Sequence, residues 1–235
     1  MHHQAYGFEV VLPGERVRFI HGPTLENDSA LCRVKSVERA DPRSLIIRFE
    51  EPIPVGIGAG DALENADWHP SVSFCNNTVR HNRARGALFT TPEPVLVEHN
   101  RFLWSSGSAI LLAGDAQGWY ESGACGNVII RRNEFDHCLT SLFQFTDAII
   151  SICPEVKQPQ AQKARYHENI RIEHNVFRTH RVPLLSAVSA DKVSFRHNRV
   201  IYDDNGPTLF SGEPYRLRHC GKMKLQPIAL PGSRK

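Results

Sequence analysis

Two stretches of the chain combine carboxylates with aromatic side chains, which are the residue types that sugar chemistry uses. The first spans residues 114–123 and contains Asp115, Trp119, Tyr120 and Glu121. The second spans residues 154–166 and contains Glu155. A carboxyl pair about 5–5.5 Å apart suits glycoside hydrolysis with retention, and a pair about 6.5–9.5 Å apart suits inversion. Aromatic rings can stack on the apolar face of a sugar. The simpler alternative is that the carboxylates cap turns and Trp119 shields the fold.

An internal repeat determines where these stretches lie. The pattern apolar-x-apolar-x-x-Asn-x-apolar occurs five times, centred on Asn77, Asn100, Asn133, Asn175 and Asn198. Successive asparagines are separated by 23, 33, 42 and 23 residues. A base period of 23 therefore carries two insertions, of 10 and 19 residues. Function in repeat proteins tends to lie on such insertions.

The repeat predicts a parallel β-helix over residues 67–220, with about five recognisable coils. Its apolar positions alternate with period two, which indicates strands, and strong helix starts are absent. Stacked coils would repeat at roughly 4.7–4.9 Å, so the asparagines would form a structural ladder at the turns. A leucine-rich repeat would need a leucine-dominated consensus. We expect a second strand in each coil, beginning at Ala87, Ala109 and Ala148 in three of them. Six or seven residues after these starts come Glu93, Asp115 and Glu155. These acids should therefore lie close to one column along the stack of coils.

The flanking segments differ from the repeat. Residues 1–66 predict a small antiparallel β-barrel-like domain, with turns at Pro13-Gly14 and Asp41-Pro42. The expected strands are Phe8–Leu12, Val17–Ile20, Cys32–Val37 and Leu45–Phe49. Residues 221–235 are basic and contain proline and glycine, so we expect a loose tail. The fold class is therefore all-β.

Composition excludes several classes of function. With 28 basic and 25 acidic residues the formal net charge is +3, and the basic residues are scattered, so no nucleic-acid partner is predicted. No apolar run approaches the roughly 20 residues of a membrane span, and no secretory leader opens the chain. The six cysteines form no CxxC pair and the twelve histidines form no HxH or HExxH motif. We therefore expect no metal and no cofactor.

Six stretches carry a family resemblance, namely Asn82–Leu88, Ser106–Leu111, Gly114-Asp115, Trp119–Ala124, Thr146–Ser151 and Pro154-Glu155. At these residues the sequence resembles glycoside hydrolase family 110, the exo-acting α-1,3-galactosidases. The resemblance implies a right-handed β-helix and metal-independent hydrolysis, with inversion, of terminal α-1,3-linked galactose on a glycan. It implies the acids Asp115, Glu121 and Asp147, with Asp136 a weaker candidate. It also implies sugar contacts by Trp119, Tyr120 and Glu155, and an orienting role for Arg85.

The resemblance carries further expectations. Members of this family are longer, so we expect an N-terminally truncated member. It would be a gene fragment, an incomplete gene prediction, or a protein that pairs its exposed coil with a partner. A homodimer is a separate expectation. The family is exported, so a secreted or periplasmic location is expected. Two other functions stay open. One is a non-catalytic carbohydrate-binding or structural β-helix. The other is a lyase, which would favour a basic catalytic residue and is disfavoured by the acid-rich stretches.

Overall fold

The computed structural model describes residues 11–42, 44–121, 123–141, 147–203 and 213–229. The described chain is all-β, as predicted, and its one helical segment is the short 3₁₀ turn η2 (Pro159–Ala161). No helix among the described residues has the length and apolar character that a membrane span requires. The chain divides into two compact units, which are described separately. The antiparallel unit is Met1–Pro70 with Gly114–Gly123 and Glu155–Ala164, and the β-helix unit is the remainder.

The antiparallel unit contains one four-stranded sheet, which confirms the predicted antiparallel strands. Its strands lie in the order β3-β2-β1-β4, with the bounds β1 Arg16–Ile20, β2 Asn27–Asp41, β3 Ser44–Phe49 and β4 Ala62–Asn65. Alternate residues of β1 and β2 point inward, and Val17, Phe19, Cys32 and Val34 form a buried core. The expected strand Phe8–Leu12 falls largely outside the described residues, and Val11 and Leu12 lie in no strand.

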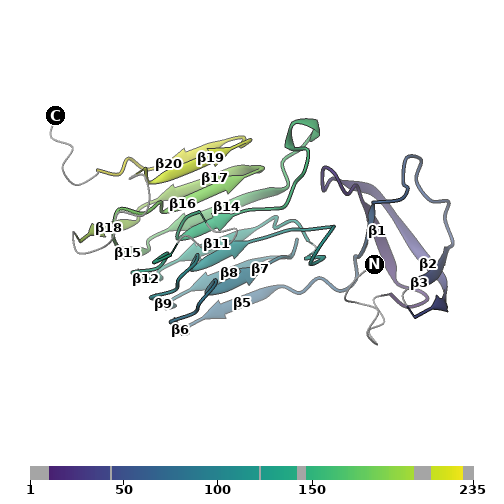
Figure 1. The fold of residues 1–235 in the computed structure, drawn as a ribbon, viewed down its shortest axis with the longest axis horizontal. Coiled ribbons are helices and arrows are strands. Elements are labelled where there is room, and N and C mark those ends of the chain that lie inside the picture. Colours follow the sequence, from purple (N-terminus) through teal and green to yellow (C-terminus); the bar gives the residue numbers. More distant parts are fainter. Residues whose placement is uncertain (1–10, 43, 122, 142–146, 204–212, 230–235) are drawn as a thin grey trace. The chain divides into compact units, whose positions relative to one another are not determined.

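The β-helix unit consists of three parallel sheets, and the coils contribute strands to them in turn (Figure 1). The first sheet contains β5 Val72–Cys75, β8 Val95–Glu98, β11 Val128–Arg131, β14 His167–Glu173, β17 Ala190–Arg196 and β20 Met223–Leu225. The second contains β6 Thr78–Arg80, β9 Arg101–Leu103, β12 Glu134–Asp136, β15 Val176–Thr179 and β18 Arg199–Tyr202. The third contains β7 Ala87–Phe89, β10 Ile110–Leu112, β13 Ile150–Ile152, β16 Leu185–Val188 and β19 Tyr215–Arg218. The predicted parallel β-helix is thus confirmed.

Identical positions of successive coils stack in the core. Phe102, Phe135 and Phe177 occupy one register position of the second sheet and are completely buried. The ring centroids of Phe102 and Phe135 lie 5.3 Å apart, and those of Phe135 and Phe177 lie 4.7 Å apart, both pairs nearly parallel. Parallel in-register pairing brings like residues together, so the apolar alternation of the sequence becomes a continuous core.

The five asparagines form the predicted ladder. The backbone N–H groups of Asn77, Asn100, Asn133 and Asn175 each donate to the side-chain oxygen of the next asparagine at 2.9 Å. The residue before each asparagine has a left-handed φ between 55° and 59°, which turns the chain from the first sheet into the second. The asparagine amides therefore satisfy backbone groups that the turn removes from the strand ladders.

Two details differ from the sequence expectations. Residues 221–229 contain β20, which pairs with β17, and Gln226 accepts a hydrogen bond from the N–H of Asn198 at 2.8 Å. Glutamine thus replaces asparagine in a sixth coil, where a loose tail was expected. The third-sheet register also pairs Ala87 with Ile110 and Ile110 with Ile150, instead of the expected Ala109 and Ala148. The shift leaves Asp115 and Glu155 at equivalent positions but moves Glu93 one residue out of that column.

Candidate active site and a histidine–aspartate cluster

Asp115 organises the first excursion from the β-helix. Its side chain is buried, and its two oxygens accept hydrogen bonds from the backbone N–H groups of Gln117, Gly118, Trp119 and Tyr120. Burial opposes ionisation, but these four donors outweigh it and hold the pKa of Asp115 below its ordinary value. Asp115 is therefore an ionised carboxylate that holds the loop in shape.

The loop closes tightly around this carboxylate. The N–H of Asp115 donates to the carbonyl of Glu121 at 2.9 Å, and Tyr120 has a left-handed φ of 55°. A Cβ on Gly118 would lie 3.2 Å from a carboxylate oxygen of Asp115, so the turn favours glycine there. The closed turn leaves the Trp119 side chain 68% exposed. An exposed indole on a fixed loop can serve as a stacking platform for a sugar ring.

The second excursion lies beside the first. The N–H of Glu155 donates to the carbonyl of Gly114 at 2.8 Å, which continues the parallel register for a few residues beyond the third sheet. Farther along, the side chain of Gln162 donates to the carbonyl of Thr24 at 2.7 Å. The carboxylate of Glu26 accepts from the N–H groups of Lys163 and Ala164. Both excursions therefore fold with the antiparallel strands, whereas chain order had assigned them to the β-helix.

Asp115 and Glu121 influence the third acid of the excursions, Glu155. The pKa of Glu155 is raised mainly because its carboxyl is partly buried. Repulsion from the charges of Asp115 and Glu121 raises it further. The same neighbourhood thus contains Asp115, whose pKa is lowered, and Glu155, whose pKa is raised. Carboxyls with pKa values moved apart in this way can divide the roles of proton donor and proton acceptor.

The other residues predicted for the site belong to the β-helix unit. Asp147 is exposed just before β13, and its N–H donates to the hydroxyl of Ser151 at 3.3 Å. Arg85 is partly buried, and its carbonyl accepts from the side chain of Asn82 at 3.2 Å. Asp136, at the end of β12, pairs with the neighbouring His137 and so joins a different cluster. The catalytic and sugar-binding roles of all these residues stay predictions.

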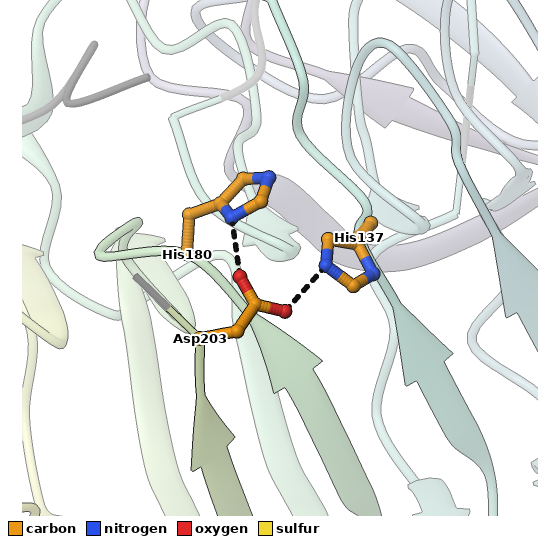
Figure 2. Close-up of side chains that lie close together, drawn as sticks. All are labelled: His137, His180 and Asp203. Carbon is orange, nitrogen blue, oxygen red and sulfur yellow. Dashed lines mark hydrogen bonds and ion pairs between the residues drawn. The ribbon is translucent and has the colours of Figure 1, made fainter. Parts of the chain in front are cut away.

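A histidine–aspartate cluster occupies the ends of β12, β15 and β18 (Figure 2). The Asp203 carboxylate lies between two imidazoles, with Nε2 of His137 at 2.6 Å and Nδ1 of His180 at 2.8 Å. Burial disfavours the charged ring, but hydrogen bonds with Asp136 and Asp203 outweigh it and raise the pKa of His137. Burial also opposes ionisation of Asp203, yet the two histidines lower its pKa.

Sequence reasoning missed His137, His180 and Asp203, although the repeat contained a signal for them. His137 follows Asn133 by four residues, and Trp104 follows Asn100 by the same number. His180 and Asp203 each follow their asparagines, Asn175 and Asn198, by five. Equal offsets in stacked coils mean neighbouring side chains, so aligning the coils beyond the asparagine would have grouped His180 with Asp203, and Trp104 with His137. The one-residue difference between the two offsets hid the contact of His137 with Asp203.

The fold defines the chain as a parallel β-helix protein with an added antiparallel β unit that carries an acidic, aromatic excursion. Residues 1–63 match the family model described as GLAA-B beta-barrel domain II. An alpha-1,3-galactosidase B of Akkermansia muciniphila is 57% identical over 229 residues, which cover 96% of this chain and 28% of that protein. Proteins of the same name from Parabacteroides distasonis and Phocaeicola vulgatus are 43% and 40% identical, over 92% and 96% of this chain.

The predicted resemblance to the α-1,3-galactosidases is therefore confirmed along nearly the whole chain. The chain spans only 28%, 37% and 40% of the lengths of these three relatives. What the relatives' name says about activity accordingly enters only as a proposal for this chain.

Proposed function

We propose that this chain forms part of a glycoside hydrolase that removes terminal α-1,3-linked galactose from glycans with inversion. The observation that carries the proposal is the 57% identity, over 96% of the chain, to a protein named alpha-1,3-galactosidase B. The match includes both excursions of the β-helix, where the acids gather. A secreted or periplasmic location and a homodimer remain predictions, checked by cell fractionation and by light scattering.

The proposed chemistry uses one protonated and one ionised carboxyl. In an inverting reaction the acid gives its proton to the departing glycosidic oxygen, and the base takes a proton from the water that attacks C1 from the opposite face. We assign the acid to Glu155, because its raised pKa favours the protonated form. The carboxylate of Asp115 is occupied by four N–H groups, which leaves Glu121 of the same unit as the candidate for the base. The catalytic role of Asp147, which belongs to the β-helix unit, stays a separate prediction. Trp119 would hold the apolar face of the galactose.

A non-catalytic glycan-binding role is the second candidate. The specific observation that favours it is the combination of Asp115 as a turn anchor with the exposed indole of Trp119. Such a loop can bind a sugar by stacking without any proton transfer. In that case the acids would hydrogen-bond hydroxyl groups and leave the glycosidic bond intact.

The test is release of galactose from an α-1,3-linked digalactoside, followed by NMR of the first product anomer. Inversion predicts β-galactose as the initial product. Glu155→Gln and Glu121→Gln should each lower kcat by at least about 100-fold, because general acid–base catalysis typically contributes 10²–10⁴. Glu168→Gln is the matched control, because Glu168 is exposed on β14 and pairs only with Lys192 among the ion pairs of the described chain.

The outcomes separate the two candidates. Galactose release that is lost in Glu155→Gln and kept in Glu168→Gln supports hydrolysis with Glu155 as the acid. Sugar binding without release, weakened by Trp119→Ala, supports the binding role. Full activity in Glu155→Gln would show that another carboxyl donates the proton.

A further inference from the structure

Three potential metal ligands meet on one face of the β-helix. His137, His180 and Asp203 follow β12, β15 and β18, so they come from three consecutive coils (Figure 2). One donor atom from each lies within 4.8 Å of the others. The side chains are 17%, 11% and 33% exposed, respectively. The chain separates them by 43 and 23 residues, so only the stacking of coils brings them together.

We propose that His137, His180 and Asp203 form a binding site for one transition-metal dication of the zinc type. Two imidazole nitrogens and one carboxylate oxygen are a donor set that suits Zn²⁺, Co²⁺ or Ni²⁺ better than Ca²⁺ or Mg²⁺, which prefer oxygen ligands. Three protein ligands leave a position for water in a four-coordinate site.

The ring of His137 is oriented for this role by its surroundings. Its Nδ1 bonds to the carboxylate of Asp136, while its Nε2 faces Asp203. Such a carboxylate on the far nitrogen of a ligating imidazole fixes the tautomer and ring orientation at many metal sites. The indole of Trp104 stacks on the same ring, with centroids 4.5 Å apart and planes inclined by 8°. Asp136 and Trp104 are therefore positioning residues.

The spacing of the donors requires only a small outward movement to admit the ion. Bonds of about 2.0–2.1 Å in a tetrahedral site place the ligand atoms roughly 3.3–3.4 Å apart. Nε2 of His137 now lies 2.6 Å from one oxygen of Asp203, and Nδ1 of His180 lies 2.8 Å from the other. Whichever oxygen becomes the ligand, the nitrogen next to it must move outward by about 0.5–0.8 Å. Rotation of the side chains can supply this shift. The strands that end just before these residues keep their places, because the parallel ladders hold them.

The bound ion would join the third, fourth and fifth coils at the point where each leaves the second sheet. The acid and base proposed above are not His137, His180 or Asp203, so the metal site stands independently of that assignment. The opposing interpretation is a metal-free network in which Asp203 simply pairs with two histidines.

The experiment titrates Co²⁺ and Zn²⁺ into the full chain after treatment with a chelator. His2 and His3 are replaced by alanine in every version, so that the N-terminal histidines cannot contribute. Calorimetry gives the stoichiometry and Kd for Zn²⁺, and visible absorption reports the ligand field of Co²⁺. The variants are His180→Ala, the near-isosteric Asp203→Asn, and Asp136→Asn. The control is His174→Gln, since His174 stacks on His197 with centroids 5.2 Å apart and belongs to a separate histidine pair.

The proposal predicts one ion per chain with an intense tetrahedral Co²⁺ spectrum. His180→Ala and Asp203→Asn should weaken binding by at least about 100-fold, and Asp136→Asn by about 10–100-fold, as for carboxylates that orient ligating histidines. His174→Gln should bind like the parent. Circular dichroism checks that each variant is folded. If His180→Ala does not fold, the affinity of Asp203→Asn for the metal tests the proposal. Absent binding, or one-to-one binding unchanged by Asp203→Asn, would overturn the proposal in favour of the metal-free network.

Discussion

Replacing Asn133 by alanine tests whether the asparagine ladder stabilises the β-helix. Asn133 is 2% exposed, and its side chain makes five hydrogen bonds. Its oxygen accepts from the N–H and the side-chain amide of Asn100. Its amide donates to the carbonyls of Val97 and Arg131 and to the side chain of Asn175. Alanine removes all five and leaves buried polar groups on two neighbouring coils without these partners.

The expected cost follows from the groups left without partners. Each buried group costs about 1–3 kcal/mol when its partner is lost, so Asn133→Ala should lower the free energy of unfolding by roughly 3 kcal/mol or more. For a domain of this size that corresponds to a fall in Tm of roughly 6–12 °C. Asn77→Ala is the matched control, because Asn77 is exposed on the first coil and donates to Cys75 and Asn100 only. It should cost less than about 1 kcal/mol, as for a partly solvated hydrogen bond.

The assay is urea unfolding followed by far-ultraviolet circular dichroism, with differential scanning calorimetry for the Tm. Both variants should keep the spectrum of the parent at zero denaturant. The ladder would be shown not to stabilise the β-helix if Asn133→Ala and Asn77→Ala were equally destabilising, or if Asn133→Ala cost less than about 1 kcal/mol. In either case water at the turns would satisfy the polar groups as well as the asparagines do.

Two further changes probe packing and pH. Gly86→Ala would place a Cβ 2.5 Å from the carbonyl oxygen of Ala109 and 3.0 Å from the ring of Phe102, so it should cost about 1–3 kcal/mol in urea unfolding. Gly58→Ala, which has open space, should change little; equal costs would contradict the packing argument. Burial lowers the pKa of His167 to about 3, so its contribution to stability is full above the unfolded pKa near 6.5 and falls as the pH drops towards 3. This group should therefore make the free energy of unfolding about 2 kcal/mol lower at pH 5 than at pH 7. The variant His167→Gln should lose that part of the pH dependence. The control His81→Gln, at an exposed position, should retain it.

The repeat allowed much of the β-helix to be predicted. A period-two apolar pattern followed by asparagine appears in every predicted coil, and each of these asparagines occupies the ladder. The sixth coil escaped prediction because Gln226 has a longer side chain that reaches the same N–H from a different offset. The third-sheet register was one or two residues off, because short runs such as Ala148–Ile150 are apolar throughout and give no alternation to count.

The candidate site was predictable in part. Composition and insertion length pointed to residues 114–123 and 154–166, and the pKa values of Asp115 and Glu155 move in opposite directions there. From the sequence, Asp115 as the anchor of a turn could not be distinguished from Asp115 as a catalytic acid. Both interpretations predict a carboxylate followed by glycine and aromatic residues. Four converging N–H groups are visible only in the folded loop.

The sequence by itself determined the all-β class, the coil period and the asparagines that stack, because strand alternation and turn chemistry are local properties. Tertiary structure alone decided which side chains at different offsets from the asparagine become neighbours in adjacent coils. His137, His180 and Asp203 lie far apart in the chain and share no motif. They meet because β12, β15 and β18 pair in parallel as neighbouring strands of the second sheet. The hydrogen-bonded register of these strands aligns their ends, and the three residues follow those ends.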